Sequence, residues 1–393
     1  MKNVILICDS FSSANFHVMT AVIRSLGESV HIHAIADTNE KETSLGKYAD
    51  ITYYPVHSWR ISLIERLQRI KPKLFSRILD SLFCRATKHI NNFHRTSYEK
   101  EMERVAKRVI THNDINSVFT VCFRFYHHRI ALNLLKEISF KWYQFWLDPY
   151  SNRYDQKSKL WRMEAELLEW KFFEKVQNIY ALPEVFCSNR PINSFKEKLI
   201  TFQIPYLVNR DITTQNKNII FAGSFVKGIR EPEPVLSLLL SIFTEIDKEI
   251  VFHFYVPDKT DYQKYVTLSR GRLLFHNYVN HDHLYKLLSE CYMLLNVGNY
   301  GSTQMPSKTV EYVSFRKPIL FFYKGKHDSS IEYLKKYPEV CMVDIDSDKS
   351  LIVKLLVGFI NGKHNVIKYE ELIKIESFYE STPEYLRSVI ELT

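Results

Sequence analysis

The sequence predicts an α/β protein with two similar domains, each a parallel sheet covered by helices. Short apolar runs of strand length alternate with segments whose apolar residues recur at helical spacing. The same strand and helix order begins again after the polar stretch 209–218. A chain of 393 residues is long enough for two separate cores. We therefore expect one domain at 1–210, a second at 211–370, and a terminal helix at 371–393 that packs back on the first domain.

The first half opens with an apolar strand at 4–8, followed by a helix at 18–26. Further strands are predicted at 31–36, 51–56, 117–123, 142–147, 178–182 and 200–207. Helices are predicted at 130–138 and 160–176, and another ends at about 110. Strands at such short intervals, separated by helices, are typical of a parallel sheet with crossover connections.

The second half repeats this order. Its strands are predicted at 219–222, 250–256, 273–275, 293–297 and 319–322, and its helices at 235–243, 284–288, 304–317, 351–361 and 370–393.

Composition excludes several classes of protein. No run approaches the roughly 18 apolar residues of a membrane span, and the first apolar run is cut short by Asp9, so we expect neither a membrane helix nor a signal peptide. This predicts a cytoplasmic protein. The six cysteines are far apart and form no C-x-x-C pair, which predicts free, mostly buried thiols and no metal site. His281 and His283 have no third ligand nearby. We therefore expect them to be surface residues and not metal ligands.

The segment 60–95 is strongly basic. It carries nine basic and two acidic residues, interleaved with leucine, isoleucine and phenylalanine. Such an amphipathic basic surface suits anionic lipid head groups, so the protein could associate peripherally with the inner face of the plasma membrane. A solvated helical face is an equally good interpretation, and nucleic acid is not expected as a partner.

The stretch 304–320, QMPSKTVEYVSFRKPIL, combines a short helix with a following strand. Pro306 suits the first helical turn, and Ser307 and Thr303 are candidate caps. At about 100° per residue from Ser307, Glu311 falls near 40° and Lys308 near 100°, opposite an apolar face. A helix start beside a lysine suits phosphate, and a carboxylate one turn later can accept both hydroxyls of a ribose. A half-buried helix with a solvated Lys–Glu face is the plain alternative.

This stretch resembles the P-S-K-x-x-E-Y signature, followed by G-K-P, of family-4-type retaining glycosyltransferases of the GT-B fold. The resemblance implies two Rossmann-like doubly wound domains facing a central cleft, with Glu311 on the donor ribose and the loop and helix start on its diphosphate. Many members carry a first glutamate eight positions earlier, where this chain has Thr303.

The sequence Gly223-Ser224-Phe225-Val226-Lys227-Gly228 resembles the element that opens the second domain of the family. Glycine allows a close approach of the backbone to phosphate, and Lys227 or Arg230 can neutralise it. The resemblance also places the base beside Tyr278 and Val279 and extends the donor site to the loop residues Ser302 and Thr303.

Asp148 follows a predicted strand of the first domain, and polar residues at such strand ends point into the ligand crevice of an open sheet. By resemblance it is a catalytic candidate with Glu311 and Lys308. The first loop carries Ser12, Ser13 and Asn15 in place of the usual glycine pair, and His17 follows it. These four residues are the candidates on the acceptor side.

The resemblance implies an enzyme that transfers a sugar from a UDP- or GDP-sugar to a glycan or lipid-linked acceptor in capsule, O-antigen or exopolysaccharide synthesis. Cations and helix amides could stabilise the leaving diphosphate, so neither a metal nor another cofactor is expected. Two alternatives remain open: a sugar-nucleotide 2-epimerase of the same architecture, and a catalytically silent nucleotide-sugar-binding module.

Overall fold

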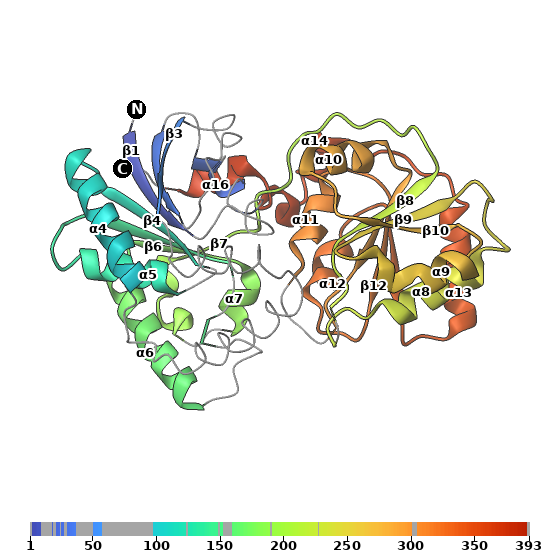
Figure 1. Cartoon of the computed structure of the whole chain (residues 1–393), viewed down its shortest axis with the longest axis horizontal. Coiled ribbons are helices and arrows are strands. Elements are labelled where there is room, and N and C mark those ends of the chain that lie inside the picture. Colours follow the sequence, from blue (N-terminus) through green and yellow to red (C-terminus); the bar gives the residue numbers. More distant parts are fainter. Residues whose placement is uncertain are drawn as a thin grey trace, which may run out of the picture. The chain divides into compact units, whose positions relative to one another are not determined.

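The computed structural model describes residues 2–8, 18, 21–23, 25–26, 30–36, 50–56, 97–122, 125–147, 150–151, 159–188, 191–226, 228–300 and 305–390. The chain divides into two compact units (Figure 1). Unit 1 comprises Met1–Gln203 and Pro383–Thr393, and unit 2 comprises Ile204–Thr382. The chain thus passes between the units at 203/204 and at 382/383, where the sequence had suggested 210/211 and 370/371.

Unit 1 is built on a parallel sheet. Its described strands are β1 (Lys2–Cys8), β2 (Val30–Ala36), β3 (Asp50–Pro55), β4 (Ser117–Cys122), β5 (Lys141–Trp146), β6 (Asn178–Ala181) and β7 (Leu199–Thr201), in the order β3-β2-β1-β4-β5-β6-β7. Each neighbouring pair is parallel. Strands buried on both sides, such as 4–8, are continuous apolar runs because both faces of the sheet are covered.

The described helices of unit 1 are α4 (Ser97–His112), α5 (Tyr126–Leu134), α6 (Lys159–Lys175), α7 (Pro183–Ser188) and α16 (Pro383–Val389), with short 3₁₀ turns η2 (Ile192–Ser194) and η3 (Lys196–Lys198). Helix α16 packs on this unit although it ends the chain. The Tyr385 hydroxyl donates to the Thr201 carbonyl at 3.2 Å, and the Tyr180 hydroxyl donates to the Val389 carbonyl at 3.2 Å. Of the predicted terminal helix at 371–393, the part from Pro383 on packs on unit 1, whereas residues up to Thr382 belong to unit 2.

Unit 2 contains a second parallel sheet. Its strands are β8 (Asn218–Ala222), β9 (Val251–Val256), β10 (Leu273–Asn277), β11 (Met293–Val297), β12 (Ile319–Tyr323) and β13 (Val340–Asp344), in the order β10-β9-β8-β11-β12-β13. Its helical elements are α8 (Pro232–Ile242), η4 (Lys259–Tyr262), α9 (Gln263–Leu268), α10 (His281–Glu290), α11 (Ser307–Val313), α12 (Ser329–Leu334), α13 (Lys349–Ile360), α14 (Tyr369–Leu372) and α15 (Glu376–Tyr379).

Helices cover both faces of the sheet of unit 2. Leu239 of α8 and Leu356 of α13 belong to one core cluster with Phe221 and Leu295. Asn296 points to the opposite face, where its Nδ2 donates to Thr309 Oγ1 of α11 at 3.0 Å. Helix α11 therefore lies on the other side of the sheet from α8 and α13, in the arrangement of a doubly wound domain.

Several elements differ from the sequence-based expectations, and the helices α7, α9 and α12 were not predicted. The segment 370–393 is not one helix, because Pro383 cannot continue a helix and the Ser381 and Thr382 hydroxyls donate to nearby carbonyls instead. Of the predicted strand at 200–207, only Ile200 and Thr201 lie in a strand, which is β7 (Leu199–Thr201). Strand β13 was missed.

The free cysteines that the structure describes, Cys8, Cys291 and Cys341, are buried, as predicted. No helix within the described ranges is both long and apolar enough to cross a bilayer.

Candidate active site

The strand order of unit 2 reverses direction between β8 and β11, so the chain segments that leave their carboxyl ends diverge. Open α/β sheets bind their ligands at such a switch point. Gly223 follows β8 and Gly298 follows β11. The two segments are joined by a hydrogen bond from the Tyr300 N–H to the Ile229 carbonyl at 2.7 Å. Side chains from these segments form the candidate site.

Arg230 links the two segments. Its Nη1 donates to the Ser224 carbonyl at 3.2 Å, and its Nη2 donates to Asn299 Oδ1 at 2.6 Å. The residue follows a tight turn in which Gly228 has φ of 78° and Val226 pairs with Arg230. Burial lowers the pKa of this guanidinium, although nearby tyrosines and Asp328 oppose the shift. Its buried Nε has no hydrogen-bond partner among the described residues.

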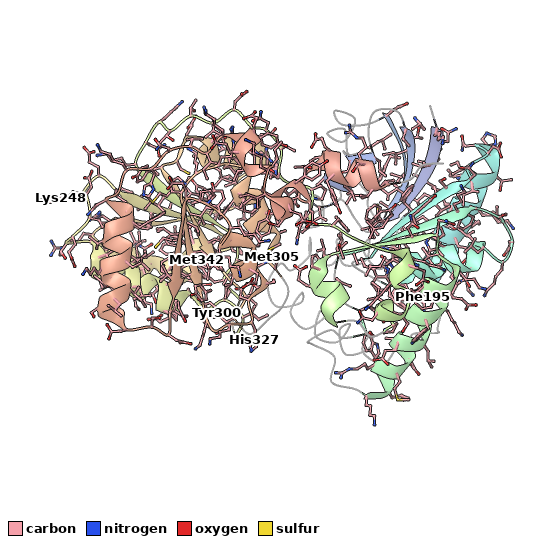
Figure 2. The ribbon with its side chains drawn as sticks, turned by 180° about the vertical axis from the view of Figure 1, so that it is seen from behind. Phe195, Lys248, Tyr300, Met305, His327 and Met342 are labelled. Atoms are coloured by element: carbon pink, nitrogen blue, oxygen red, sulfur yellow. The ribbon has the colours of Figure 1, made fainter. Side chains whose placement is uncertain are left out.

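Two further polar groups are buried near Arg230: the hydroxyl of the half-buried Tyr300 and the carboxyl group of Asp328. The Tyr300 hydroxyl has no hydrogen-bond partner in the described part of the chain, and burial raises its pKa. Asp328 is only 2% exposed, and burial raises the pKa of its carboxyl group. One of its oxygens, Oδ1, accepts from the Ser330 N–H at 2.9 Å and so caps α12. Figure 2 labels Tyr300 and His327, which precedes Asp328.

Gly298 leaves room for Asp328. A Cβ atom at position 298 would lie 1.8 Å from Asp328 Oδ2, far closer than any real contact. The absence of a side chain at the end of β11 therefore allows the capping carboxylate to approach the backbone of the switch point.

Tyr312 fixes α11 against the end of β8. Its hydroxyl accepts from the Ala222 N–H at 2.7 Å, across 90 residues of sequence. Tyr312 and Val310 are buried. For Val310 this was expected, because the helical spacing places it on the apolar face of α11. Ser307 is the first residue of α11, but a helix of seven residues has a small dipole, so the basic side chains are the stronger attraction for an anion.

Glu311 is surrounded by polar groups of its own unit. The carboxylate is 2% exposed; its Oε2 contacts Lys308 Nζ, and its Oε1 lies 3.9 Å from His281 Nε2. Burial and the nearby Glu311 raise the pKa of Tyr285 well above its usual value. Lys308 and Glu311 thus form an ion pair within one helical turn. A ribose that bound Glu311 would compete with Lys308 for this carboxylate.

Arg210 extends this group from the segment that enters unit 2. Its Nε donates to Ser314 Oγ at 2.9 Å, and its guanidinium lies 4.4 Å from the centre of the Tyr285 ring. Sequence reasoning named neither Arg210 nor Tyr285. No signal in the local pattern identified them, because the contacts join positions about 75 to 104 residues apart.

The structure brings several predicted donor-site residues near the switch point. Gly223, Ser224 and Arg230 lie after β8, and Tyr278 follows β10 with its ring largely exposed and its hydroxyl hydrogen-bonded to Ser224. Val279 is half-buried. Asn299, Tyr300 and Asp328 were not predicted. All three follow strands directly or closely, and this was the signal that could have found them.

The remaining predicted residues lie outside the described residues. These are Ser12, Ser13, Asn15, His17, Asp148, Lys227, Ser302 and Thr303, together with the basic segment 60–95. Among the residues that are described, no group of three histidine, cysteine or acidic side chains could hold a metal ion.

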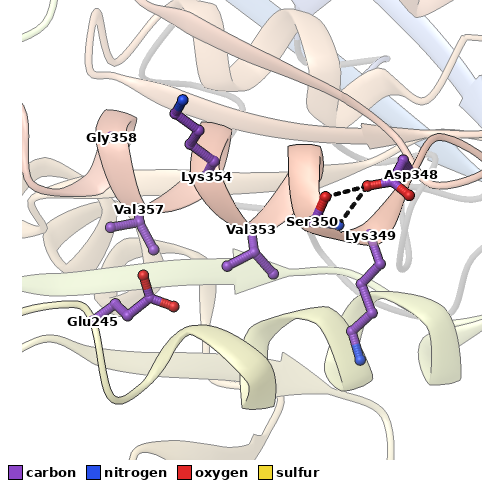
Figure 3. A pocket seen from close by; sticks show the side chains of 8 residues that line it. All are labelled: Glu245, Asp348, Lys349, Ser350, Val353, Lys354, Val357 and Gly358. Carbon is purple, nitrogen blue, oxygen red and sulfur yellow. Dashed lines mark hydrogen bonds between the residues drawn. The ribbon is translucent and has the colours of Figure 1, made fainter.

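An open pocket lies along the outer side of α13 (Figure 3). It is lined by Glu245, Asp348, Lys349, Ser350, Val353, Lys354, Val357 and Gly358. Asp348 Oδ1 accepts from the Ser350 and Leu351 N–H groups, so the start of α13 is already capped by its own carboxylate. None of the residues that line this pocket belongs to the Arg230 site.

Comparison with known proteins identifies the fold. No family model and no curated protein matches the sequence. Among solved structures, the UDP-GlcNAc 2-epimerase of Neisseria meningitidis bound to UDP-GlcNAc aligns with a TM-score of 0.60 at 11% identity, over 99% of this chain and 98% of that one. A glycotransferase of kitacinnamycin aligns with a TM-score of 0.56 at 9% identity, over 99% and 98%.

The lipopolysaccharide outer core galactosyltransferase WaaB, in its apo form, aligns with a TM-score of 0.52 at 12% identity, over 98% of this chain and 97% of that one. At such low identities these likenesses show the fold alone. The chain has the predicted GT-B fold, with two Rossmann-like α/β domains.

Proposed function

We propose that the protein is an enzyme that acts on a nucleoside-diphosphate sugar and transfers the sugar to a hydroxyl group of a glycan or lipid-linked acceptor. The observation that carries the proposal is Arg230, a largely buried cation at the switch point of unit 2 whose Nε has no hydrogen-bond partner among the described residues. Burying a guanidinium is costly unless it is paired, and an anionic ligand would satisfy it.

The chemistry of transfer fits this arrangement. Breaking the bond between a sugar and a diphosphate develops negative charge on the leaving phosphate. Arg230 supplies a cation for that charge, held by Ser224 and Asn299 before the ligand arrives. Lys227, which precedes Gly228 in the sequence, is a second candidate. A fixed cation of this kind needs no divalent metal, so activity should survive a chelator.

Glu311 is the proposed ligand of the ribose. Its buried carboxylate is held by Lys308, whose side chain is 26% exposed. When a nucleotide binds, Lys308 can turn to a phosphate oxygen and leave the carboxylate to the ribose hydroxyls. The ion pair would then keep the two groups in place until the donor arrives.

Similar folds also support an epimerase. The solved structures of similar fold include UDP-GlcNAc 2-epimerases from Neisseria meningitidis and Methanocaldococcus jannaschii. An epimerase rearranges the donor with no acceptor present, whereas a transferase releases the nucleoside diphosphate only when an acceptor hydroxyl or water takes the sugar. Analysis of the products from UDP-GlcNAc alone, by chromatography and proton NMR, separates the two functions. The NMR spectrum of a transfer product also tests the retention of anomeric configuration that the sequence resemblance implies.

Isothermal titration with UDP and GDP tests nucleotide binding. We expect Lys308→Ala and Glu311→Ala each to weaken binding at least tenfold. The matched control is the exposed pair of Glu332 on α12 and Lys335 directly after it, which has the same spacing of three residues. Lys335→Ala and Glu332→Ala should bind nucleotide as the natural chain does. If all four variants bound with the natural affinity, the nucleotide assignment would be wrong.

A further inference from the structure

Helix α6 is apolar on two opposite sides. Its inner side buries Leu168, Phe172 and Phe173 in unit 1. Its outer side exposes four large apolar side chains, which we call the α6 stripe: Leu160 (67% exposed), Met163 (53%), Leu167 (56%) and Trp170 (43%). A helix that is apolar on only one side would need no second partner, whereas this helix presents a second apolar surface to the solvent.

The spacing of the α6 stripe is that of a helix-pairing seam. The four positions are separated by three, four and three residues, as in the first and fourth places of successive heptads. At about 100° per residue, they lie within about 80° of one another and nearly opposite Phe172. The stripe is therefore a continuous strip along α6, not four scattered surface residues.

The stripe is held rigidly at its carboxyl end. The Trp170 ring meets the Phe195 ring edge-on, with 5.3 Å between centres. Lys198 Nζ donates to the Phe173 and Glu174 carbonyls at 3.0 and 2.9 Å and so caps the helix end. Figure 2 labels Phe195 beside α6. A surface fixed in this way loses little conformational entropy when it is covered.

The charges beside the stripe indicate what covers it. Lys159 and Glu166 follow one edge, and Glu164 and Lys171 follow the other. Each edge thus carries one charge of each sign, seven residues apart. An anionic bilayer would favour an excess of positive charge, which this pattern lacks. In an antiparallel pair of α6 helices, each edge meets its own reversed copy, so glutamate faces lysine on both sides.

We propose that the α6 stripe is the interface of a homodimer, in which α6 packs antiparallel on the α6 helix of a second copy. The two-fold symmetry then places Leu160 against Trp170 of the second copy and Met163 against Leu167. The outer layers combine the large Trp170 with the smaller Leu160, and the inner layers combine Met163 with Leu167, which are nearly equal in volume. The same surface on both copies makes the contact closed, so that assembly stops at two chains.

Light scattering coupled to gel filtration of the full chain, over a hundredfold range of concentration, tests the proposal. The natural chain should dimerise, and Leu167→Glu should weaken dimerisation at least tenfold because it places a charge in the seam. Since position 167 faces outward, the variant should keep the melting temperature of the natural monomer. The control is Leu268→Glu, another exposed leucine at 65%, which should leave the dimer intact. A natural chain that stays monomeric throughout would overturn the proposal.

Charge reversal tests the choice of partner. Glu164→Lys should weaken the dimer by placing lysine against lysine, and the double variant with Lys171→Glu should restore it. A double variant as weak as the single one would exclude the proposed pairing. If the natural chain is monomeric and binds phosphatidylglycerol vesicles through Leu167, the stripe is a membrane surface instead and the dimer is excluded.

Cysteine pairs test the orientation of the two helices. Met163→Cys and Leu167→Cys should cross-link to each other under mild oxidation only when the two variants are mixed. Cross-linking of Met163→Cys with itself would show parallel helices and would overturn the antiparallel arrangement.

Discussion

The Nη2 atom of Arg230 donates a hydrogen bond to Asn299 Oδ1 at 2.6 Å, which joins the segment after β8 to the segment after β11. The two segments leave the sheet in different directions, so this bond fixes the guanidinium at the point where they part. A cation held in place by its own unit does not have to be ordered when an anion binds, and this favours affinity.

Replacing Arg230 should reduce nucleotide affinity. Hydrogen bonds to charged groups contribute about 1.5–3 kcal/mol, so Arg230→Ala should weaken UDP binding roughly 10- to 100-fold in calorimetry. Arg230→Lys should recover only part of the loss, because an ammonium cannot reproduce the planar fork of donors. The control is Arg104→Ala, which removes an exposed guanidinium of α4. Unchanged UDP affinity in Arg230→Ala would contradict the proposed diphosphate site.

Removing the Tyr312 hydroxyl should destabilise unit 2. In Tyr312→Phe the Ala222 N–H loses its acceptor while it stays buried, which costs about 1–3 kcal/mol. Urea unfolding should show a lower midpoint with an unchanged slope. Tyr262→Phe is the control, because its ring is stacked against Phe275 in the same unit. Equal midpoints for the two variants would show that the contact between α11 and β8 adds nothing to stability.

A methyl group should be tolerated at one glycine of unit 2 and not at another. Gly298→Ala would bring a Cβ against Asp328 Oδ2 and force this carboxylate away from the start of α12, at a cost of about 1–3 kcal/mol. Gly358→Ala, within α13, meets no atom within 4 Å and should raise stability by up to about 1 kcal/mol. Thermal unfolding of both variants measures the difference. A Gly298→Ala variant as stable as the natural chain would mean that Asp328 moves at no cost.

Acid should destabilise unit 2 through a pair of histidines. His253 Nδ1 lies 3.0 Å from His276 Nε2, and burial together with His276 lowers the pKa of His253 to about 4. Above about pH 6.5 the imidazole is neutral in both the folded and the unfolded chain. Between about pH 6.5 and 4 only the unfolded chain takes up the proton, so stability falls as the pH falls.

Urea unfolding at pH 7.5 and pH 5 measures this effect. Because His253 is partly exposed, we expect a loss on the order of 1 kcal/mol from this group. His253→Gln should reduce the pH dependence, whereas His283→Gln, at an exposed position of α10, should not. A pH dependence that is the same in both variants would exclude His253 as its source.

The elements that the sequence predicted well are those defined by local pattern. Strand β11 has its predicted bounds, Met293–Val297, because five consecutive buried residues leave no ambiguity. Strand β13, Val340–Asp344, was not among the predicted strands; it is alternately half-buried and buried at the sheet edge, so its apolar run is short and interrupted. The last predicted helix is broken between α14 and α15 and again at Pro383, which disfavours a helical conformation of the residue before it.

The candidate site was only partly predictable, for a different physical reason. Helical spacing placed Lys308 and Glu311 on one side of α11, and they do form an ion pair. The same spacing could not show that Glu311 is buried beside Tyr285 and His281, since those contacts depend on how α10 packs on α11. Arg230 was predicted as one of two alternatives, and its contact with Asn299, 69 residues away, depends on the sheet order.

The position of α16 has a consequence for how the protein is made. Unit 1 needs Pro383–Thr393, yet all of Ile204–Thr382 is translated between its two pieces. At about 5–20 residues per second, a ribosome takes roughly 10–35 s to produce that insertion. During this time the nascent first unit lacks the hydrogen bonds to Thr201 and from Tyr180 that α16 provides. Premature termination before Pro383 should therefore yield a chain whose second unit is whole and whose first is open to proteases.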